Sequence, residues 1–412
     1  MKILIVAPNV SLTMGGEAII PYHYARELHR LGHEITVLTH ARVRDELMAT
    51  PLANDIRIDF VDDTKSEKVI YKTSKLAPPA IAETAFGAAI GIFTMRNLAR
   101  HAKELHHELA FDIIHQPTPV SPKMPSFLSV ATVPVVIGPM NGAMNYPPAF
   151  EKKYARGANV ATNLARSLSG LANSIGTAKH NADVLLVANE RSRTGLPKGT
   201  DTADRVKILV ENGVDLDLWP KTASEKFTEP TFVYVGRHVW WKAIDLLIDA
   251  FAQLDCGATL KIYGDGPERA ALEKQAAELS TKNKKIEFLG FKPQSEIANT
   301  LAKSTALVLP SLRECGGAVV LEAFACRTPA IATDWGGPSV YITPETGVLI
   351  PPTSKADFIT SLTKTMADFV ENPAQIVEMG IAARQLIEDN YSWRAKAAQM
   401  VGVYEAAIQR GK

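Results

Sequence analysis

Short apolar runs alternate with longer amphipathic stretches along the whole chain. In the first half, helical periodicity from Ile19 to Leu31 predicts a helix that Gly32 ends. The apolar runs of this half predict strands at Lys2–Ala7, Glu34–Thr39, Ile56–Val61, Ile113–His115, Val133–Ile137, Asp183–Ala188 and Val206–Val210. Strands that alternate with helices in this way are typical of parallel βαβ units.

The same alternation restarts after a polar, proline-containing break at Leu216–Pro230. It predicts strands at Thr231–Val235, Thr259–Tyr263, Ile286–Leu289, Ala306–Leu309, Ala330–Thr333 and Gly347–Ile350, and helices at Ala243–Leu254, Glu268–Leu279 and Trp393–Gln409. We therefore expect an α/β chain with two doubly wound, Rossmann-like domains, residues 1–215 and 216–392. Two placements of the last helix, 393–412, stay open: it can pack on the second domain, or on the first domain, which it would then complete. Ligands of such sheets bind at the carboxyl ends of the strands, so the two domains are expected to face a shared cleft.

Composition narrows the class of protein. The 412 residues are 46% hydrophobic and 22% charged with a net charge of +1, which is typical of a globular chain. The chain has no basic stripe of the kind that nucleic-acid binding needs. Cys256, Cys315 and Cys326 lack paired spacing, so we expect neither a disulfide framework nor a zinc site, and we expect a reducing, cytoplasmic location.

One apolar stretch raises the question of a membrane contact. No run is long enough to span a bilayer, and Pro8 ends the first apolar run too early for a signal peptide. The stretch Ala77–Met95 is apolar but contains two prolines and Glu83. Basic residues flank it at Lys72, Lys75, Arg96, Arg100 and Lys103. Two interpretations stay open: a packed helix with a solvated basic edge, and a peripheral contact with the inner face of a membrane.

The segment Pro310–Ala325 carries the clearest candidate chemistry. It runs from an expected strand through Gly316 and Gly317 into an expected helix, and it contains Glu314 and Glu322. Backbone N–H groups and the helix dipole favour an anion at such a helix N-terminus. Carboxylates beside it suit the hydroxyl groups of a sugar. This combination points to a nucleotide-sugar as the ligand, with Cys315 as a small filler residue.

A second cluster follows the first strand of the second half. That strand ends at Gly236, and Arg237 and Lys242 come directly after it. Two cations at the cleft end of a strand can neutralise a diphosphate and the charge that grows as it leaves. The alternative is a pair of solvated cations beside a tight turn.

Two further strand ends are expected near a nucleobase. Gly264 and Gly266 form a turn before a helix, and Asp265 between them suits a helix cap. Phe291 follows the next strand, whose end can face a base edge.

The first half offers weaker candidates. Gly15 and Gly16 open a helix after the first strand, where a backbone can approach a pyrophosphate closely. The pair is not a GxGxxG motif, which argues against a dinucleotide-dependent oxidoreductase. His115 and Asn141 follow two other strands and are candidate contacts for the sugar or the acceptor. A histidine satisfied within the core is the alternative for His115.

These motifs together resemble the retaining glycosyltransferases of the GT-B fold, family four, over nearly the whole chain. The resemblance is carried by Glu314 and Glu322, by the pair Arg237 and Lys242, by the Gly-Asp-Gly-Pro turn from Gly264, by the Asn-Gly-Val-Asp run from Asn212, and by the Gly-Gly-Glu loop from Gly15. One departure is that Pro117 stands where many relatives carry a histidine near this strand end, so the family's role for a histidine is not carried over to His115.

The resemblance implies a role for each residue of the motifs. Gly16 would contact the donor phosphate, and Arg237 with Lys242 would bind the diphosphate. Glu314 would hold hydroxyls of the donor sugar and Glu322 those of the ribose. The backbone amides of Gly316, Gly317 and Ala318 would lie nearby.

The resemblance also implies an activity. The chain would transfer a sugar with retention from a nucleotide-sugar, most simply a UDP-sugar, to a carbohydrate or lipid-linked acceptor, in polysaccharide biosynthesis. No bound metal and no cofactor would be required. Two rivals are another GT-B enzyme acting on UDP-sugars, such as an epimerase or a sucrose-type synthase, and a non-catalytic nucleotide-sugar-binding protein.

Overall fold

A computed structural model describes residues 1–76, 85–154, 176–219, 227–281 and 283–410. The first part of the apolar stretch Ala77–Met95, residues 77–84, lies outside this range, as do residues 220–226 of the expected break. The chain divides into two compact units. The first comprises Met1–Ala143, Ala158–Glu211 and Lys396–Lys412, and the second comprises Met144–Gly157 and Asn212–Ala395.

The first unit is built on a sheet of parallel strands. Its described strands are β1 (Lys2–Val6), β2 (Glu34–His40), β3 (Arg57–Val61), β4 (Ile113–Gln116), β5 (Val135–Met140), β6 (Val184–Val187) and β7 (Val206–Ile208). They lie in the order β3-β2-β1-β4-β5-β6-β7. The chain begins in the middle of the sheet, and the strand order reverses between β1 and β4. Loops at such a reversal point leave a crevice at the carboxyl ends of the strands.

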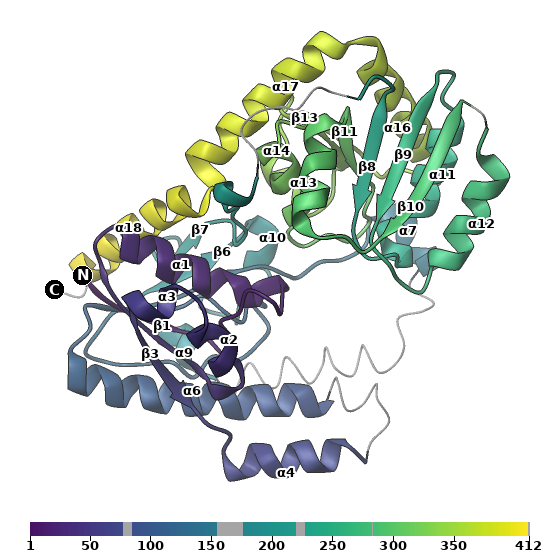
Figure 1. The fold of residues 1–412 in the computed structure, drawn as a ribbon. Helices are drawn as coiled ribbons and strands as arrows, with labels where there is room; N and C mark the ends of the chain where they lie inside the picture. Colours follow the sequence, from purple (N-terminus) through teal and green to yellow (C-terminus); the bar gives the residue numbers. More distant parts are fainter. Residues whose placement is uncertain (77–84, 155–175, 220–226, 282, 411–412) are drawn as a thin grey trace. The chain divides into compact units, whose positions relative to one another are not determined.

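Helices pack against this sheet because their apolar faces match it (Figure 1). The longest are α1 (Ile19–Arg30), α6 (Gly87–Leu109) and α18 (Trp393–Arg410), with α4 (Lys65–Ser74) beside α6. Shorter elements are η1 (Gly16–Ala18), η2 (Ala41–Val43), α2 (Arg44–Met48), α3 (Leu52–Asp55), α9 (Ala178–Asn181) and α10 (Glu190–Arg193). Met95 and Leu98 of α6 join Leu4, Ile114 and Leu185 of the strands in one buried core.

The second unit repeats the same plan. Its described strands are β8 (Thr231–Val235), β9 (Ala258–Tyr263), β10 (Lys284–Gly290), β11 (Ala306–Leu309), β12 (Ala330–Thr333) and β13 (Gly347–Ile350). They pair in parallel in the order β10-β9-β8-β11-β12-β13. The order reverses between β8 and β11, so this unit has its own crevice at the ends of those two strands.

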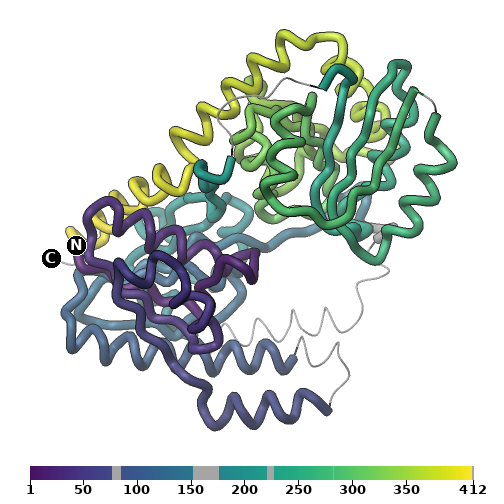
Figure 2. The backbone as a smooth tube through the Cα atoms, in the orientation of Figure 1, coloured from purple at the N-terminus to yellow at the C-terminus, as the bar shows by residue number. Residues whose placement is uncertain are grey.

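Most helices of the second unit alternate with its strands or follow them in sequence, while α7 and η5 precede them (Figure 2). They are α7 (Pro148–Tyr154), η5 (Leu216–Leu218), η6 (Trp240–Lys242), α11 (Ile244–Ala252), α12 (Arg269–Leu279), α13 (Gln294–Lys303), α14 (Ala318–Ala325), α15 (Pro338–Tyr341), α16 (Lys355–Glu371), α17 (Pro373–Leu386) and η7 (Ile387–Tyr391). Helix α7 belongs to this unit although strands of the first unit flank it in the sequence. Its Phe150 ring lies edge-on to Phe358 of α16, at 6.2 Å between centroids.

The structure confirms the predicted α/β class with two doubly wound sheets. Each strand expected from the apolar runs is present, with bounds that differ by a few residues at most. Among the described residues, no helix combines the length and apolarity needed to cross a bilayer.

Candidate active site

The loops that follow the strands of the second sheet are joined by backbone hydrogen bonds. Gly264 N donates to Gly290 O at 2.8 Å, and Gly236 N donates to Tyr263 O at 3.1 Å. On the other side of β8, Leu312 N donates to Trp241 O at 2.9 Å. The ends of β10, β9, β8 and β11 therefore form one connected edge, and the residues expected to bind a donor lie along it.

Two glycines allow the loop after β9 to approach the loop after β8. A Cβ on Gly264 would lie 2.0 Å from Gly236 O, and one on Gly266 would lie 2.4 Å from His238 O. Gly264 also has a φ of 113°. His238 N completes the contact by donating to Asp265 O at 2.8 Å. These glycines therefore position the turn that carries Arg237.

Lys242 and Glu314 meet across the point where the strand order reverses. Lys242 ends the short helix η6 after β8, and Glu314 follows β11. The Lys242 ammonium donates to the Glu314 carboxylate in an ion pair. Both side chains are largely enclosed, at 17% and 14% exposure. Arg237, by contrast, is exposed at the same edge.

A buried tyrosine holds the loop that carries Arg237. Tyr234, in β8, donates its hydroxyl to the Arg237 carbonyl at 3.2 Å. Burial raises its pKa well above the usual value of 10.0, and the nearby charge of Glu314 adds to the effect. Tyr234 therefore stays neutral and fixes the backbone of the loop that carries Arg237.

The glycine turn and helix N-terminus expected after β11 are present. Gly317 adopts a φ of 66° directly before α14, which begins at Ala318. Gly316 is half-buried, and Cys315 and Ala318 are exposed. The first N–H groups of a helix lack partners within the helix, so this N-terminus offers donors to an anion.

The loop after β12 packs closely against the backbone at Glu314. Gly337 N donates to Glu314 O at 3.0 Å, and a Cβ on Gly336 would lie 2.1 Å from that oxygen. The neighbouring Trp335 donates its ring N–H to Asn145 O at 2.8 Å. Tyr146 follows, with its ring 5.1 Å from that of Trp240. The segment Met144–Tyr146 is thus part of this site's surroundings, which sequence analysis did not find.

Glu322 lies one turn into α14 and carries a perturbed carboxyl group. Burial raises its pKa to about 7 from 4.5. Among the described residues, its carboxylate has neither a hydrogen-bond donor nor an ion-pair partner. A carboxylate in this state can accept hydrogen bonds from the hydroxyls of a ligand. At the far end of the edge, Phe291 is 89% exposed directly after β10.

The candidates from the first half of the chain all lie in the first unit. Gly15 and Gly16 are exposed, with φ values of 67° and 57° and open space beside each Cα. Glu46 holds the preceding loop, because its carboxylate accepts from Ser11 Oγ at 2.8 Å and from Leu12 N at 2.8 Å. The loop is therefore anchored at its base and accessible at its glycines.

His115 and Asn141 are enclosed. His115 is fully buried, with Nε2 2.6 Å from Gly138 O and Nδ1 2.7 Å from the Tyr404 hydroxyl. Burial lowers its pKa to about 4. Asn141 is 6% exposed and donates to Glu211 at 2.7 Å. For His115 this geometry favours the alternative of a satisfied core histidine over a substrate contact, and Asn141 belongs to a buried polar network.

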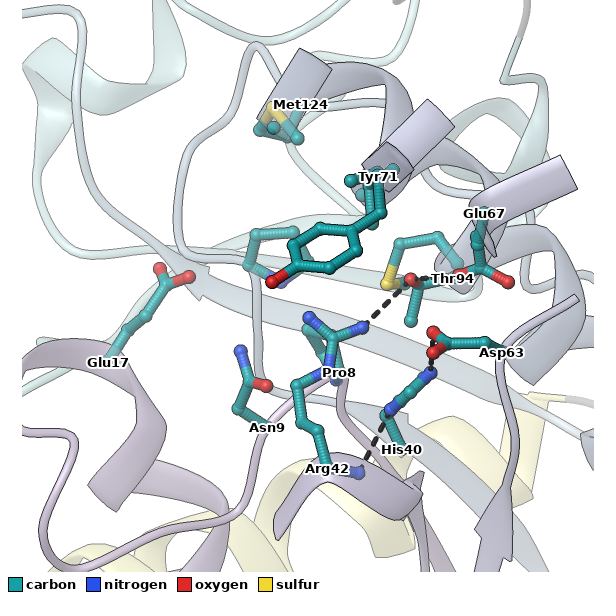
Figure 3. Close-up of a pocket in the computed structure, with 15 residues that line it drawn as sticks. Pro8, Asn9, Glu17, His40, Arg42, Asp63, Glu67, Tyr71, Thr94 and Met124 are labelled. Atoms are coloured by element: carbon teal, nitrogen blue, oxygen red, sulfur yellow. Dashed lines mark hydrogen bonds and ion pairs between the residues drawn. The ribbon is translucent and has the colours of Figure 1, made fainter. Parts of the chain in front are cut away.

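The first unit also holds a pocket that the sequence did not reveal. It has a volume of about 540 Å³ and lies where β1, β2, β3 and β4 end. Its polar lining comes from Asn9, Glu17, His40, Arg42, Asp63, Glu67, Tyr71 and Thr94. Figure 3 shows the Arg42 guanidinium projecting into its middle. Polar residues at or near the ends of two strands, His40 and Asp63, were the available signal.

Three side chains of this pocket have the spacing of metal ligands. The ligand atoms of His40, Asp63 and Glu67 all lie within 4.8 Å of one another. However, His40 Nδ1 accepts the backbone N–H of Arg42 at 3.1 Å, so the proton of the neutral ring lies on Nε2. That nitrogen faces Asp63 Oδ1 at 3.1 Å. A protonated Nε2 has no lone pair to give to a metal ion, so the group fits a polar binding surface better than a metal centre.

A family model matches most of the second unit. Residues 217–385 match the family model described as "Glycosyl transferases group 1". The second unit is therefore similar to the glycosyl transferases group 1. The match contains Arg237, Lys242, Glu314 and Glu322.

Curated relatives are similar over part of their length. A glycogen synthase of Mycobacterium tuberculosis is 32% identical over 209 residues, which cover 50% of this chain and 49% of that protein. A GDP-mannose-dependent phosphatidylinositol monomannoside mannosyltransferase of Corynebacterium glutamicum is 28% identical over 226 residues, covering 51% and 55%. The chain thus spans about half the length of the curated relatives that it matches.

Solved structures of glycosyl transferases match nearly the whole chain. Sucrose-phosphate synthase of Thermosynechococcus elongatus has a TM-score of 0.64 with 19% identity and covers 100% of both chains. HepE of Anabaena, solved in complex with UDP-glucose, has a TM-score of 0.61 with 18% identity and covers 98% of this chain and 100% of its own. At this level of identity the likeness establishes the fold, which is GT-B as the sequence predicted.

Proposed function

We propose that this protein is a retaining glycosyltransferase that moves a hexosyl group from a UDP-sugar to a carbohydrate or lipid-linked acceptor. The observation that carries the proposal is the ion pair of Lys242 and Glu314 beside the N-terminus of α14. A cation, a hydroxyl acceptor and free backbone donors then lie together where a doubly wound sheet binds its ligand.

The cations would act on the leaving group. As the bond between sugar and phosphate breaks, negative charge grows on the departing diphosphate. Lys242 and Arg237 would neutralise that charge, together with the N–H groups that begin α14. Groups placed where charge develops accelerate the chemical step more than groups that bind the ground state equally well. We propose that these cations take the place of a metal ion.

The carboxylates would hold the neutral parts of the donor. Glu314 would accept hydrogen bonds from sugar hydroxyls, and Glu322 from the ribose. The exposed ring of Phe291 and the backbone at Gly290 would lie toward the base. Uridine as the base is supported by HepE, which was solved with UDP-glucose, whereas one curated relative is GDP-mannose-dependent by name.

The pocket of the first unit would take the acceptor. Its polar atoms offer both kinds of hydrogen-bond partner, because Asp63 accepts and Arg42 donates. Arg42 Nη2 donates to Thr94 Oγ1 at 3.1 Å, which fixes the guanidinium. A surface that mixes carboxylates with one cation suits a polyhydroxyl headgroup better than a strongly charged one.

A panel of nucleotide-sugars tests the donor. UDP-glucose, UDP-galactose, GDP-mannose and ADP-glucose would each be added to the full chain, and thermal stability and slow donor hydrolysis would be followed. A donor at about 100 times its Kd stabilises by about 2.7 kcal/mol, so the true donor should raise Tm by a few degrees. No shift and no hydrolysis with any member would contradict the proposal.

The stereochemical course and the main rival are tested with the best donor. Proton NMR of the product reports the anomeric configuration, and a retaining enzyme converts an α-linked donor into an α-linked product. A β-linked product would overturn retention. Conversion of the UDP-sugar into its epimer without any acceptor would instead identify an epimerase.

A further inference from the structure

Helix α4 presents apolar side chains to the solvent. Val69 is 63% exposed, Tyr71 is 56% exposed, and Leu76, in the turn after the helix, is 89% exposed. Figure 1 shows α4 lying beside α6 within the first unit. The described helices of the molecule otherwise bury most residues of this size, so three such side chains within eight positions of sequence form an unusual surface.

The same surface is basic. Lys65, Lys68, Lys72 and Lys75 are all exposed, and none of them forms an ion pair with a residue that the structure describes. The one acidic residue of the segment, Glu67, is 1% exposed and lies inward. The positive charge of this helix is therefore not compensated locally.

Helical geometry places the two kinds of side chain together. At 100° per residue, Lys65, Val69 and Lys72 fall within an arc of about 60°. Glu67 and Tyr71 lie on the opposite side, where both line the pocket of the first unit. Two contacts hold Glu67 on the inward side. In a capping box, the Glu67 carboxylate accepts from Thr64 N at 2.8 Å. The same carboxylate accepts from Thr94 Oγ1 of α6 at 2.5 Å. We name the outward residues Lys65, Lys68, Val69, Lys72, Lys75 and Leu76 the α4 surface.

The α4 surface adjoins the pocket of the first unit. Glu67 and Tyr71 of α4 line that pocket, and Ile90 and Met95 of α6 line it from the neighbouring helix. Figure 3 shows the Tyr71 ring beside the pocket, with Arg42 below it. A ligand in the pocket would therefore lie within one helix width of whatever the α4 surface contacts.

We propose that the α4 surface docks on an anionic lipid bilayer and brings the pocket to the headgroup of a membrane-bound acceptor. Interleaved lysine and apolar side chains on one helix face match such a surface, because the apolar groups enter the headgroup layer while the ammonium groups contact lipid phosphates. The docking stands on the α4 surface alone. The role of the headgroup as acceptor rests on the proposed function.

Vesicle binding by the full chain tests the docking. Sedimentation would compare phosphatidylcholine vesicles with vesicles that contain about one third phosphatidylglycerol, at low and high salt. We expect binding to the anionic vesicles only, weakened by salt. Each of Lys68→Gln and Lys72→Gln should weaken binding roughly fivefold. The pair Val69→Gln and Leu76→Gln should weaken it at least tenfold, since glutamine keeps the helix propensity.

Matched changes elsewhere serve as controls. Val377 and Ile381, on α17, are 52% and 53% exposed, so replacing both by glutamine removes similar apolar area. Lys274→Gln on α12 removes a similar exposed charge. These variants should bind vesicles as the parent does. Equal loss in the controls, or no binding by the parent, would overturn the docking.

Two further outcomes are informative. If the α4 variants lower the oligomeric state in gel filtration while vesicles are never bound, the surface pairs with a second copy and the proposal fails. Donor hydrolysis is measured in parallel on the same samples. Vesicle binding with neither donor hydrolysis nor a donor-induced rise in Tm would preserve the docking and contradict the proposed transferase function instead.

Discussion

Lys242 and Glu314 neutralise each other beyond the ends of the paired strands β8 and β11. Their side chains are 17% and 14% exposed, so neither charge is fully solvated. A donor that brings a diphosphate to the lysine and sugar hydroxyls to the glutamate would supply each with a second partner. The pair is therefore preorganised for a ligand that carries both groups, and each residue can be tested separately.

Lys242→Ala should lower the rate of transfer by about a hundredfold or more, because it removes a cation placed where charge develops. Steady-state kinetics with the best donor measures the loss. Lys261→Ala is the control, since Lys261 pairs with Glu287 at 3.0 Å in the same unit. Near-normal turnover in the Lys242 variant would contradict its role at the leaving group.

Glu314→Gln should separate sugar binding from phosphate binding. The change removes the carboxylate but leaves Lys242 free for the diphosphate. We expect transfer to fall strongly while the affinity for UDP, measured by calorimetry, is kept or improved. A parallel loss of UDP affinity would indicate that Glu314 positions the whole loop rather than the sugar.

Gly264→Ala should disrupt the backbone contact that joins the loops after β9 and β8. A Cβ at this position would lie 2.0 Å from Gly236 O, and the φ of 113° is itself unfavourable for alanine. We expect a loss of unfolding free energy of about 3 kcal/mol or more, read from urea denaturation. Gly402→Ala in α18 is the control, because its Cβ meets nothing within 4 Å. That change should leave stability equal or raise it by up to about 1 kcal/mol.

Removal of metal ions should leave transfer largely intact. The proposal assigns the neutralising charge to Arg237 and Lys242, so a chelator takes nothing from the site. Initial rates before and after EDTA treatment measure this. Complete loss of activity that magnesium restores would show that a metal contributes to the reaction.

The sequence predicted the features that depend on local pattern. Apolar runs gave the strands, and the order of motifs placed Arg237, Lys242 and Glu314 each directly after a strand. The pairing of Lys242 with Glu314 required the strand order, in which β8 and β11 become neighbours although β9 and β10 lie between them in sequence. No local pattern encodes that adjacency.

Other features depend on tertiary contacts that have no signal in one sequence. The segment Met144–Gly157 groups with the second unit, where Trp335 donates to Asn145 O. His115 could be placed at a strand end, but its burial depends on Tyr404, which lies 289 positions away. The pocket of the first unit similarly combines the ends of four strands with α4 and α6.

Glu322 should make UDP binding depend on pH. Burial raises its pKa to about 7 in the folded chain from 4.5, so it is largely protonated at pH 6 and largely ionised at pH 8. If the ionised carboxylate accepts from the ribose, UDP affinity should rise between these pH values. Glu322→Gln should bind UDP more weakly at pH 8. The UDP affinity of this variant should also depend less on pH. The variant serves as the control for titration of the UDP phosphate, because that titration affects both proteins equally.

The Glu322 carboxyl also makes the free energy of unfolding depend on pH. Because the folded pKa is raised, the folded chain binds the proton more tightly than the unfolded chain, and stability falls as pH rises from about 4.5 to above 7. The loss is at most about 3 kcal/mol. Urea denaturation at pH 5 and pH 8 should therefore show Glu322→Gln relatively more stable at the higher pH. An equal difference at both pH values would mean that the folded pKa is not raised.

His115 should affect stability and leave donor binding unchanged. His115→Ala removes hydrogen bonds to Gly138 O and to Tyr404, so we expect a loss of about 2–4 kcal/mol with a UDP affinity within about twofold of the parent. Tyr404→Phe, which removes one of these bonds, should cost about 1–2 kcal/mol.

The buried His115 ring has a pKa of about 4 against an ordinary 6.5. The unfolded chain therefore takes up the proton first, and stability falls as pH drops through this interval. Urea denaturation at pH 7 and pH 5 should show that this acid loss shrinks in His115→Ala. A variant that keeps the parent's stability but loses transfer would instead place His115 at the substrate.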